Sequence, residues 1–115
     1  MFAVSSERFD ELVQDALDEL PKQLAGAVEN VVVMVEDHAA GRNLFGLYEG
    51  VPLTKRGPLS YHGAFPDRIT IYQGTISEHC NDEAELVSQV RKTVLHEVAH
   101  HFGISDPRLV ELGWA

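Results

Sequence analysis

The chain has little cysteine, little positive charge and no long apolar run. Its single cysteine, Cys80, excludes an internal disulfide and gives no sign of an oxidising compartment. With 9 lysines and arginines against 18 aspartates and glutamates, the formal net charge is -9, so the averaged surface field repels phosphate backbones and anionic lipid headgroups. No segment approaches the roughly 20 apolar residues that a transmembrane helix needs. We therefore expect neither nucleic acid nor a membrane among its partners.

The N-terminal segment MFAVSSERFDELVQ also lacks the basic residues and the apolar run of a secretory signal. Together with the lone cysteine, this predicts a soluble cytoplasmic protein. At 115 residues the chain has the length of one compact domain, large enough for a single core and too small for a second folding unit. Residues 1 to 115 are therefore expected to form one domain that carries one site.

Apolar residues at helical spacing predict a first helix near the N-terminus. Ser5 or Ser6 can cap this helix, and Pro21 then bends or restarts it before Gly26 helps to close it. Acids and amides separate the apolar positions, so the helix is amphipathic. These apolar positions are Phe9, Leu12, Val13, Ala16, Leu17 and Leu20.

Three segments of the sequence predict strands. The continuous β-branched run NVVVMVED, residues 30 to 37, is expected to be covered on both faces and so to lie at the centre of a small sheet. DRITIYQG, residues 67 to 74, alternates apolar and polar side chains, which is the pattern of a strand with one solvent-exposed face. Residues 39 to 67 are rich in glycine and proline, and FGLYEGVPL is the segment among them that best fits a strand.

A second, longer helix is predicted from Asn81 or Asp82 to Phe102. Glu85 stands three positions after Asp82 and completes a start that resembles a capping box. Gly103 supplies the left-handed residue that ends the helix. At about 100° per residue, the helix has an apolar face and a polar face. The apolar face carries Val87, Val90, Val94 and Val98, and the polar face carries Gln89, Lys92, His96 and His100.

The end of this helix contains an HExxH motif, within the segment HEVAHHFGISD, residues 96 to 106. His96 and His100 lie one turn apart, with about 5–6 Å between their Cβ atoms, so both imidazoles can bind one tetrahedral ion. Glu97 points about 100° around the helix, where its carboxylate can take a proton from a water molecule beside the metal. The spacing therefore predicts a Zn²⁺ site with Glu97 as general base.

A catalytic zinc site needs a third protein ligand and an open position for water. The turn at Gly103 lets the chain double back so that Asp106 can reach the ion, which extends the motif to HExxHxxGxxD. Asp106 is also a good N-cap for a last helical turn that opens with Pro107 and stops at Gly113, and a carboxylate with two oxygens can serve as both ligand and cap. Among the other histidines, His101 is expected to pack toward the core, whereas His38, His62 and His79 lie in predicted loops and are alternative third ligands.

These features together resemble a known family. The short length, GLYEGVPLTKRG, DRITIYQG and the C-terminal HEVAHHFGISD are similar to the small bacterial zincin-like metallopeptidases. The resemblance implies an α+β minimal zincin-like fold, with a small mixed β-sheet, a backing N-terminal helix and a C-terminal active-site helix. It also implies a peptidase that acts on a peptide or protein, with zinc held by His96, His100 and Asp106 and with Glu97 as the catalytic residue.

The resemblance carries two further expectations. In zincins the strand beside the active-site helix often pairs with extended substrate, which would assign that role to residues 68 to 73; the alternative is a strand paired on both sides. Only nine residues follow Asp106, so there is no room for the downstream methionine turn of larger relatives. Met34, the only internal methionine, is expected to be ordinary core; the alternative is a role beneath the metal.

Two other functions fit the same motif. One is a zinc-binding scaffold or interaction module without turnover, because so short a chain has little room for a substrate cleft. The other is a small zinc-dependent ribonuclease resembling the bacterial rRNA-maturation family, although that family lacks the glutamate after the first histidine and the net charge of -9 opposes RNA binding. For a peptidase, the side chains that could stabilise the oxyanion are Tyr48, Tyr61, Tyr72 and His62, and no spacing chooses among them.

Overall fold

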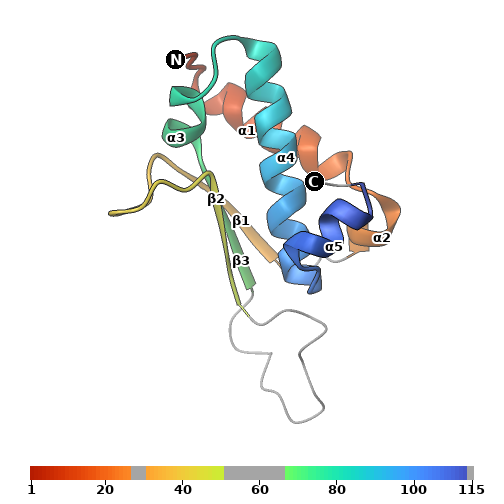
Figure 1. Ribbon diagram of the computed structural model, residues 1–115. Coiled ribbons are helices and arrows are strands. Elements are labelled where there is room, and N and C mark those ends of the chain that lie inside the picture. The colour runs from red at the N-terminus through yellow and green to blue at the C-terminus, as the bar shows by residue number, and fades with distance from the viewer. Residues whose placement is uncertain (27–30, 51–66, 114–115) are drawn as a thin grey trace.

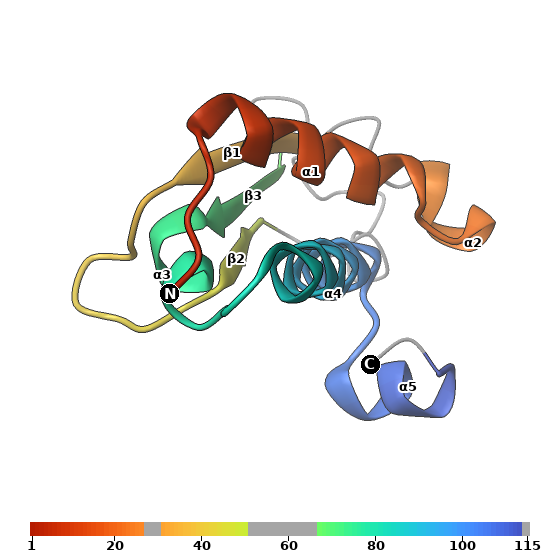
Figure 2. The ribbon, with the colours of Figure 1, turned by 90° about the horizontal axis from the view of Figure 1, so that it is seen from above.

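The computed structural model of the chain describes residues 1 to 26, 31 to 50 and 67 to 113. In Figures 1 and 2, two helices lie against the same face of a small sheet. The predicted α+β class is confirmed, and none of the described helices is long and apolar enough to cross a membrane. The elements are α1 (Ser6–Asp18), α2 (Lys22–Ala25), β1 (Val31–Glu36), β2 (Gly46–Glu49), β3 (Asp67–Tyr72), α3 (Gln73–Glu78), α4 (Glu83–Phe102) and α5 (Asp106–Glu111).

The sheet has the strand order β1-β3-β2, so β3 and not β1 is the central strand. β3 runs parallel to β1, with Val31 opposite Asp67, and antiparallel to β2, with Gly46 opposite Ile71. The expectation that residues 30 to 37 form a central strand covered on both faces is therefore wrong. β1 is an edge strand whose burial alternates, and its second face leaves Val32 43% and Met34 37% exposed. Met34 is accordingly not a core residue.

β3 is buried along almost its whole length, which corrects the expectation of one solvent-exposed face. Ile69 and Ile71 enter the core, and Thr70 and Tyr72 on the other face are also buried. Because both of its edges are paired within the sheet, β3 has no edge open to an extended substrate, so the role expected for residues 68 to 73 is ruled out. The sheet edge beside the active-site helix belongs to β2.

The core lies between the sheet and the helices α1 and α4 (Figure 2). Both helices begin as predicted, since the Ser5 hydroxyl accepts a hydrogen bond from the Arg8 amide and the Asp82 carboxylate accepts one from the Glu85 amide. Each fully buried aliphatic side chain contributes about 1.5–3 kcal/mol of transfer free energy to folding. The core side chains of the two helices are Phe9, Leu12, Val13, Ala16, Leu86, Val90, Val94, Val98 and Ala99.

Helix α3 is an element that the sequence pattern did not predict. Its six residues, QGTISE, are too few to display a helical period, and they follow β3 without a break. Gly74 fixes this junction: its amide donates to the Asp37 carbonyl over 2.8 Å, and a Cβ atom would lie 2.8 Å from that same carbonyl oxygen. The junction therefore requires the close backbone approach that glycine allows.

Candidate metal centre

The C-terminal half of α4 brings two histidines together on its polar face. His96 and His100 stack edge to face with 4.2 Å between their ring centroids, and their side chains are 41% and 32% exposed. Both imidazoles are anchored to a helix whose opposite face is buried in the core through Val94 and Val98. The pair is therefore held by a rigid element and remains accessible from solvent.

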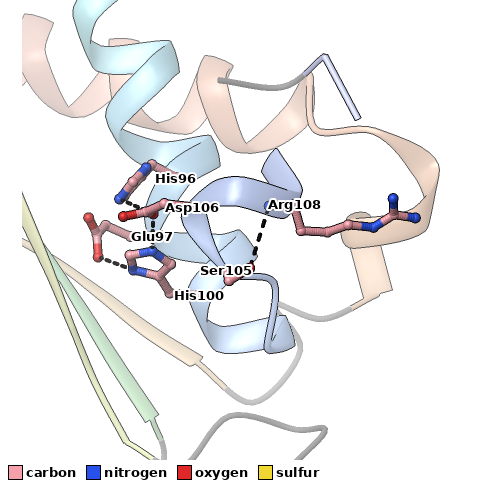
Figure 3. Close-up of polar contacts among 6 residues, drawn as sticks. All are labelled: His96, Glu97, His100, Ser105, Asp106 and Arg108. Atoms are coloured by element: carbon pink, nitrogen blue, oxygen red, sulfur yellow. Dashed lines mark hydrogen bonds and ion pairs between the residues drawn. The ribbon is translucent and has the colours of Figure 1, made fainter. Parts of the chain in front are cut away.

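The chain reverses directly after this helix, as the glycine predicted. Gly103 has a φ of 92°, its amide donates to the His100 carbonyl over 2.9 Å, and the Ile104 amide donates to the Ala99 carbonyl over 2.8 Å. This hydrogen-bond pattern is that of a Schellman-type helix end, which needs a residue in the left-handed region. As a result α5 folds back beside the end of α4 (Figure 3).

Ser105, and not Asp106, is the N-cap of α5. The Ser105 hydroxyl accepts a hydrogen bond from the Arg108 amide, and Asp106 is the first residue inside the helix. The prediction that Asp106 caps this helix is therefore wrong by one residue. Asp106 is an acidic residue in the first turn of α5, where the helix dipole favours a negative charge.

The Asp106 side chain points at the two histidines instead (Figure 3). Its Oδ1 atom lies 2.9 Å from Nε2 of His100 and 3.4 Å from Nε2 of His96. The hydrogen bond from His100 lowers the pKa of the Asp106 carboxyl, which therefore stays charged at neutral pH. Two imidazole nitrogens and one carboxylate oxygen converge from two elements, and they form a donor set that Zn²⁺ binds in catalytic sites. The three residues fit a zinc ion.

Glu97 occupies a different position from these three residues. Its side chain is buried, its Oε1 atom lies 3.6 Å from Nδ1 of His100, and its carboxylate accepts a hydrogen bond from the Tyr48 amide of β2. Burial raises the pKa of the Glu97 carboxyl, while the charges of the two histidines and the Tyr48 amide oppose that shift. Potential ligand atoms of His96, Glu97 and His100 lie within 4.8 Å of one another. A carboxylate of raised pKa beside a metal site is suited to accept a proton.

Strand β2 presents its outer edge to this carboxylate. The Tyr72 amide donates to the Phe45 carbonyl over 2.9 Å, and hydrogen-bonded residues alternate in an antiparallel ladder. Leu47 and Glu49 therefore face β3, while Gly46 and Tyr48 turn their backbone groups to the outer edge. The contact between the Tyr48 amide and Glu97 agrees with this direction.

Gly46 lets α4 pack unusually close to β2. A Cβ atom at this position would lie 2.8 Å from Cγ2 of Thr93 and 3.0 Å from Cγ of Glu97. Both separations are shorter than carbon atoms tolerate without displacement. The sequence pattern does not predict this role of Gly46, because glycine in a segment rich in glycine and proline also indicates turns.

A buried polar cluster lies behind the site and was also not predicted as a unit. One oxygen of Asp67 accepts a hydrogen bond from the Tyr48 hydroxyl over 2.8 Å and lies 2.7 Å from Nδ1 of His101. His101 is 1% exposed, which confirms the prediction that it packs toward the core. The cluster connects β2, β3 and α4. It therefore fixes the position of β2, whose Tyr48 amide hydrogen-bonds to Glu97.

The remaining predicted candidates have other contacts or lie outside the described residues. The Tyr48 hydroxyl is committed to Asp67 and so is no oxyanion donor, and Tyr72 is buried in β3. His38 contacts Glu78, and His79 contacts the Thr75 carbonyl. In the parts of the chain that the structure describes, these candidates therefore lie apart from the group of His96, Glu97 and His100 and the adjoining Asp106. Tyr61 and His62 lie outside the described residues.

The fold and the site together define a minimal zincin. A family model for zincin-like metallopeptidases matches residues 28–114, which is most of the chain, and the chain therefore belongs to this family. Among solved structures, it is similar to a conserved hypothetical protein from Thermus thermophilus, with a TM-score of 0.59 and 28% identity. That similarity covers 86% of this chain and 94% of the other. No curated protein matches the chain.

Proposed function

We propose that the protein is a zinc-dependent metallopeptidase that hydrolyses peptide bonds, with Glu97 as general base and with His96, His100 and Asp106 as the metal ligands. The observation that carries the proposal is that the two carboxylates beside the histidines differ in exposure and in pKa. Asp106 is exposed and charged between the two histidines, whereas Glu97 is buried beside them with a raised pKa. One carboxylate is suited to bind metal and the other to move a proton.

When bound, zinc would supply Lewis-acid chemistry, because it lowers the pKa of a water molecule and polarises a carbonyl group. The ligands from α4 and α5 would hold the ion on the solvent side of the helix. Glu97 then accepts the proton of the attacking water and returns it to the leaving amine. The amide of Tyr48 orients the Glu97 carboxylate, since it hydrogen-bonds to that group from β2.

We further propose that the substrate is a peptide or protein and that its backbone lies along β2. Support comes from the position of β2, which lies at one edge of the described sheet and beside Glu97. An extended chain can add to such a strand edge. The lone, buried cysteine fits a cytoplasmic location, which is part of the same proposal.

The test compares the wild type with Glu97→Gln. The substitution is nearly isosteric and leaves all three proposed ligands in place, so zinc content should remain near one ion per chain. Cleavage should fall by about 10²–10⁴-fold, because an amide cannot accept the proton of water. Zinc content is measured by mass spectrometry of the metal, and cleavage is measured on a mixed peptide library with and without chelator.

Each alternative predicts a different result. Zinc bound at one ion per chain with no cleavage by the wild type would favour a binding scaffold. Cleavage that survives in Glu97→Gln would point to another base or to a contaminating protease. Cleavage of RNA that depends on the same metal would favour the nuclease.

A further inference from the structure

A pocket of about 350 Å³ lies beside His96 and Glu97, and its lining also includes a lysine, Lys92. It is formed where the start of β2 meets the polar face of α4. Its volume is near the lower limit of typical ligand sites, roughly 300–1,000 Å³, which suits one side chain of a substrate. Besides the two motif residues, Phe45, Gly46, Gln89, Lys92 and Thr93 line it.

Lys92 is the only lysine or arginine among the described residues that line this pocket, and it also borders the groove lined by Glu83 and Arg91. It stands one helical turn before His96 and is exposed on the same face of α4. No acidic side chain lies within ion-pair distance of Lys92 in the described parts of the chain, although acidic residues outnumber basic ones by two to one overall. Arg8, Arg68, Arg91 and Arg108 each form an ion pair with a glutamate. Lys92 shares the lack of an ion pair with Lys22 and Arg42 among the described residues, but of these three only Lys92 lines the pocket.

The other polar groups of the pocket are mostly committed to each other. The Thr93 hydroxyl donates to the Gln89 carbonyl over 2.8 Å and accepts from the Gln89 side-chain amide over 3.1 Å. Thr93 has thus used its one proton, and Lys92 is the charged donor that remains. The Glu97 carboxylate is engaged by the Tyr48 amide and by the site histidines, away from Lys92 along the helix. A free ammonium group favours an acceptor-only ligand, which is a carboxylate.

We propose that this pocket binds the substrate side chain next to the scissile bond and that Lys92 selects a carboxylate there. This inference rests on the proposed peptidase function, because it takes His96 and Glu97 as the place of cleavage. The carboxylate can come from an aspartate or glutamate side chain or from the C-terminal end of a short peptide. Lys92 is a specificity residue in this proposal and takes no part in bond cleavage.

The experiment measures binding of matched peptide hydroxamates to the zinc-loaded protein by calorimetry. Three probes differ only in the side chain next to the hydroxamate, which is glutamate, glutamine or lysine. A fourth probe carries glutamine and a free C-terminal carboxylate in place of the amide used in the others, which separates the two sources of the carboxylate. The variants are Lys92→Met, Lys92→Glu and, as a control with the same change of net charge outside the pocket, Lys22→Glu.

We expect either the glutamate probe or the probe with the free C-terminal carboxylate to bind the wild type about fivefold more tightly than the glutamine probe with the C-terminal amide. A partly exposed ion pair allows a preference of this size. High salt should weaken that preference. Lys92→Met should abolish it, Lys92→Glu should reverse it toward the lysine probe, and Lys22→Glu should leave it unchanged. Equal binding of all probes, a preference that survives Lys92→Met, or no binding of any probe would overturn the proposal. Because binding is measured, failure of peptide hydrolysis alone would overturn the proposed function and leave the selectivity standing.

Discussion

The sequence allows Asp106 to be a metal ligand, the N-cap of the last helix, or both, and the structure separates these two roles. Ser105 provides the cap of α5, and the Asp106 carboxylate lies within 3.4 Å of both site histidines. The motif could predict the histidines and Glu97 because their spacing within one helix fixes their relative positions. It could not decide the cap, since serine and aspartate are both good N-caps and stand side by side.

Substitution of Asp106 should therefore affect the metal and spare the helix. Asp106→Ala and Asp106→Asn should both weaken zinc binding by about tenfold or more, because losses even outside the ligand shell cost roughly 10–100-fold in affinity. Ser105→Ala is the matched control, which should cost about 1 kcal/mol of stability through the lost cap and change zinc affinity far less. The measurements are zinc affinity by competition with a chelator and stability by denaturant unfolding.

If Asp106→Asn binds zinc as tightly as the wild type, the carboxylate charge is not needed and the third ligand lies elsewhere. His62 would then be the first residue to substitute, because His38 and His79 have contacts of their own with Glu78 and Thr75.

At the scale of elements, the contact between β2 and α4 holds Glu97 beside the ligands that α4 and α5 provide. Glu97 belongs to the helix, the amide that holds it belongs to the strand, and Gly46 sets the distance between the two. The sequence could predict α4 because its apolar residues recur at helical spacing over a long, continuous segment. It could not give the strand order, because the β-branched run of β1 has the composition of a central strand while pairing with distant residues places β3 there.

Gly46→Ala should push β2 and α4 apart. The added methyl group would meet Thr93 and Glu97, so we expect a loss of about 1–3 kcal/mol in the free energy of unfolding, as for other overpacked cores. Peptide cleavage should fall as well, because Glu97 would leave the Tyr48 amide. Thr93→Ser removes the methyl group that lies nearest to the new atom, and the double variant should recover part of the stability. Denaturant unfolding and library cleavage of the three variants check this.

Equal stability of Gly46→Ala and the wild type would show that the strand and the helix can adjust without cost. A stability loss that Thr93→Ser fails to reduce would place the strain elsewhere, for instance at the Thr70 carbonyl, which a Cβ atom would approach to 3.3 Å.

At the scale of the whole molecule, the metal site and the core occupy different parts of the structure. The core is built mainly from α1, α4 and β3, with Leu109 of α5 also fully buried in it, whereas the proposed ligands lie on the outer face of α4 and at the start of α5. α4 takes part in both, and its buried face does not require zinc. The hydrophobic pattern could predict this division, because the histidines fall opposite the valines on the helical projection.

Removal of zinc should therefore lower the melting temperature without unfolding the domain. A ligand that binds only the folded state at a hundredfold excess over its Kd stabilises by about 2.7 kcal/mol, which is roughly 10 °C for a domain of this size. Calorimetric melting of zinc-loaded and chelator-treated protein measures the shift, and circular dichroism at about 25 °C reports whether the metal-free chain is folded.

The double variant His96→Ala/His100→Ala should melt at the same temperature with and without chelator, whereas Glu97→Gln should keep the shift, since it retains every ligand. A metal-free chain without helical signal would mean that folding requires zinc, and an unchanged melting temperature in protein shown to have lost its zinc would mean that the folded chain does not preassemble the site.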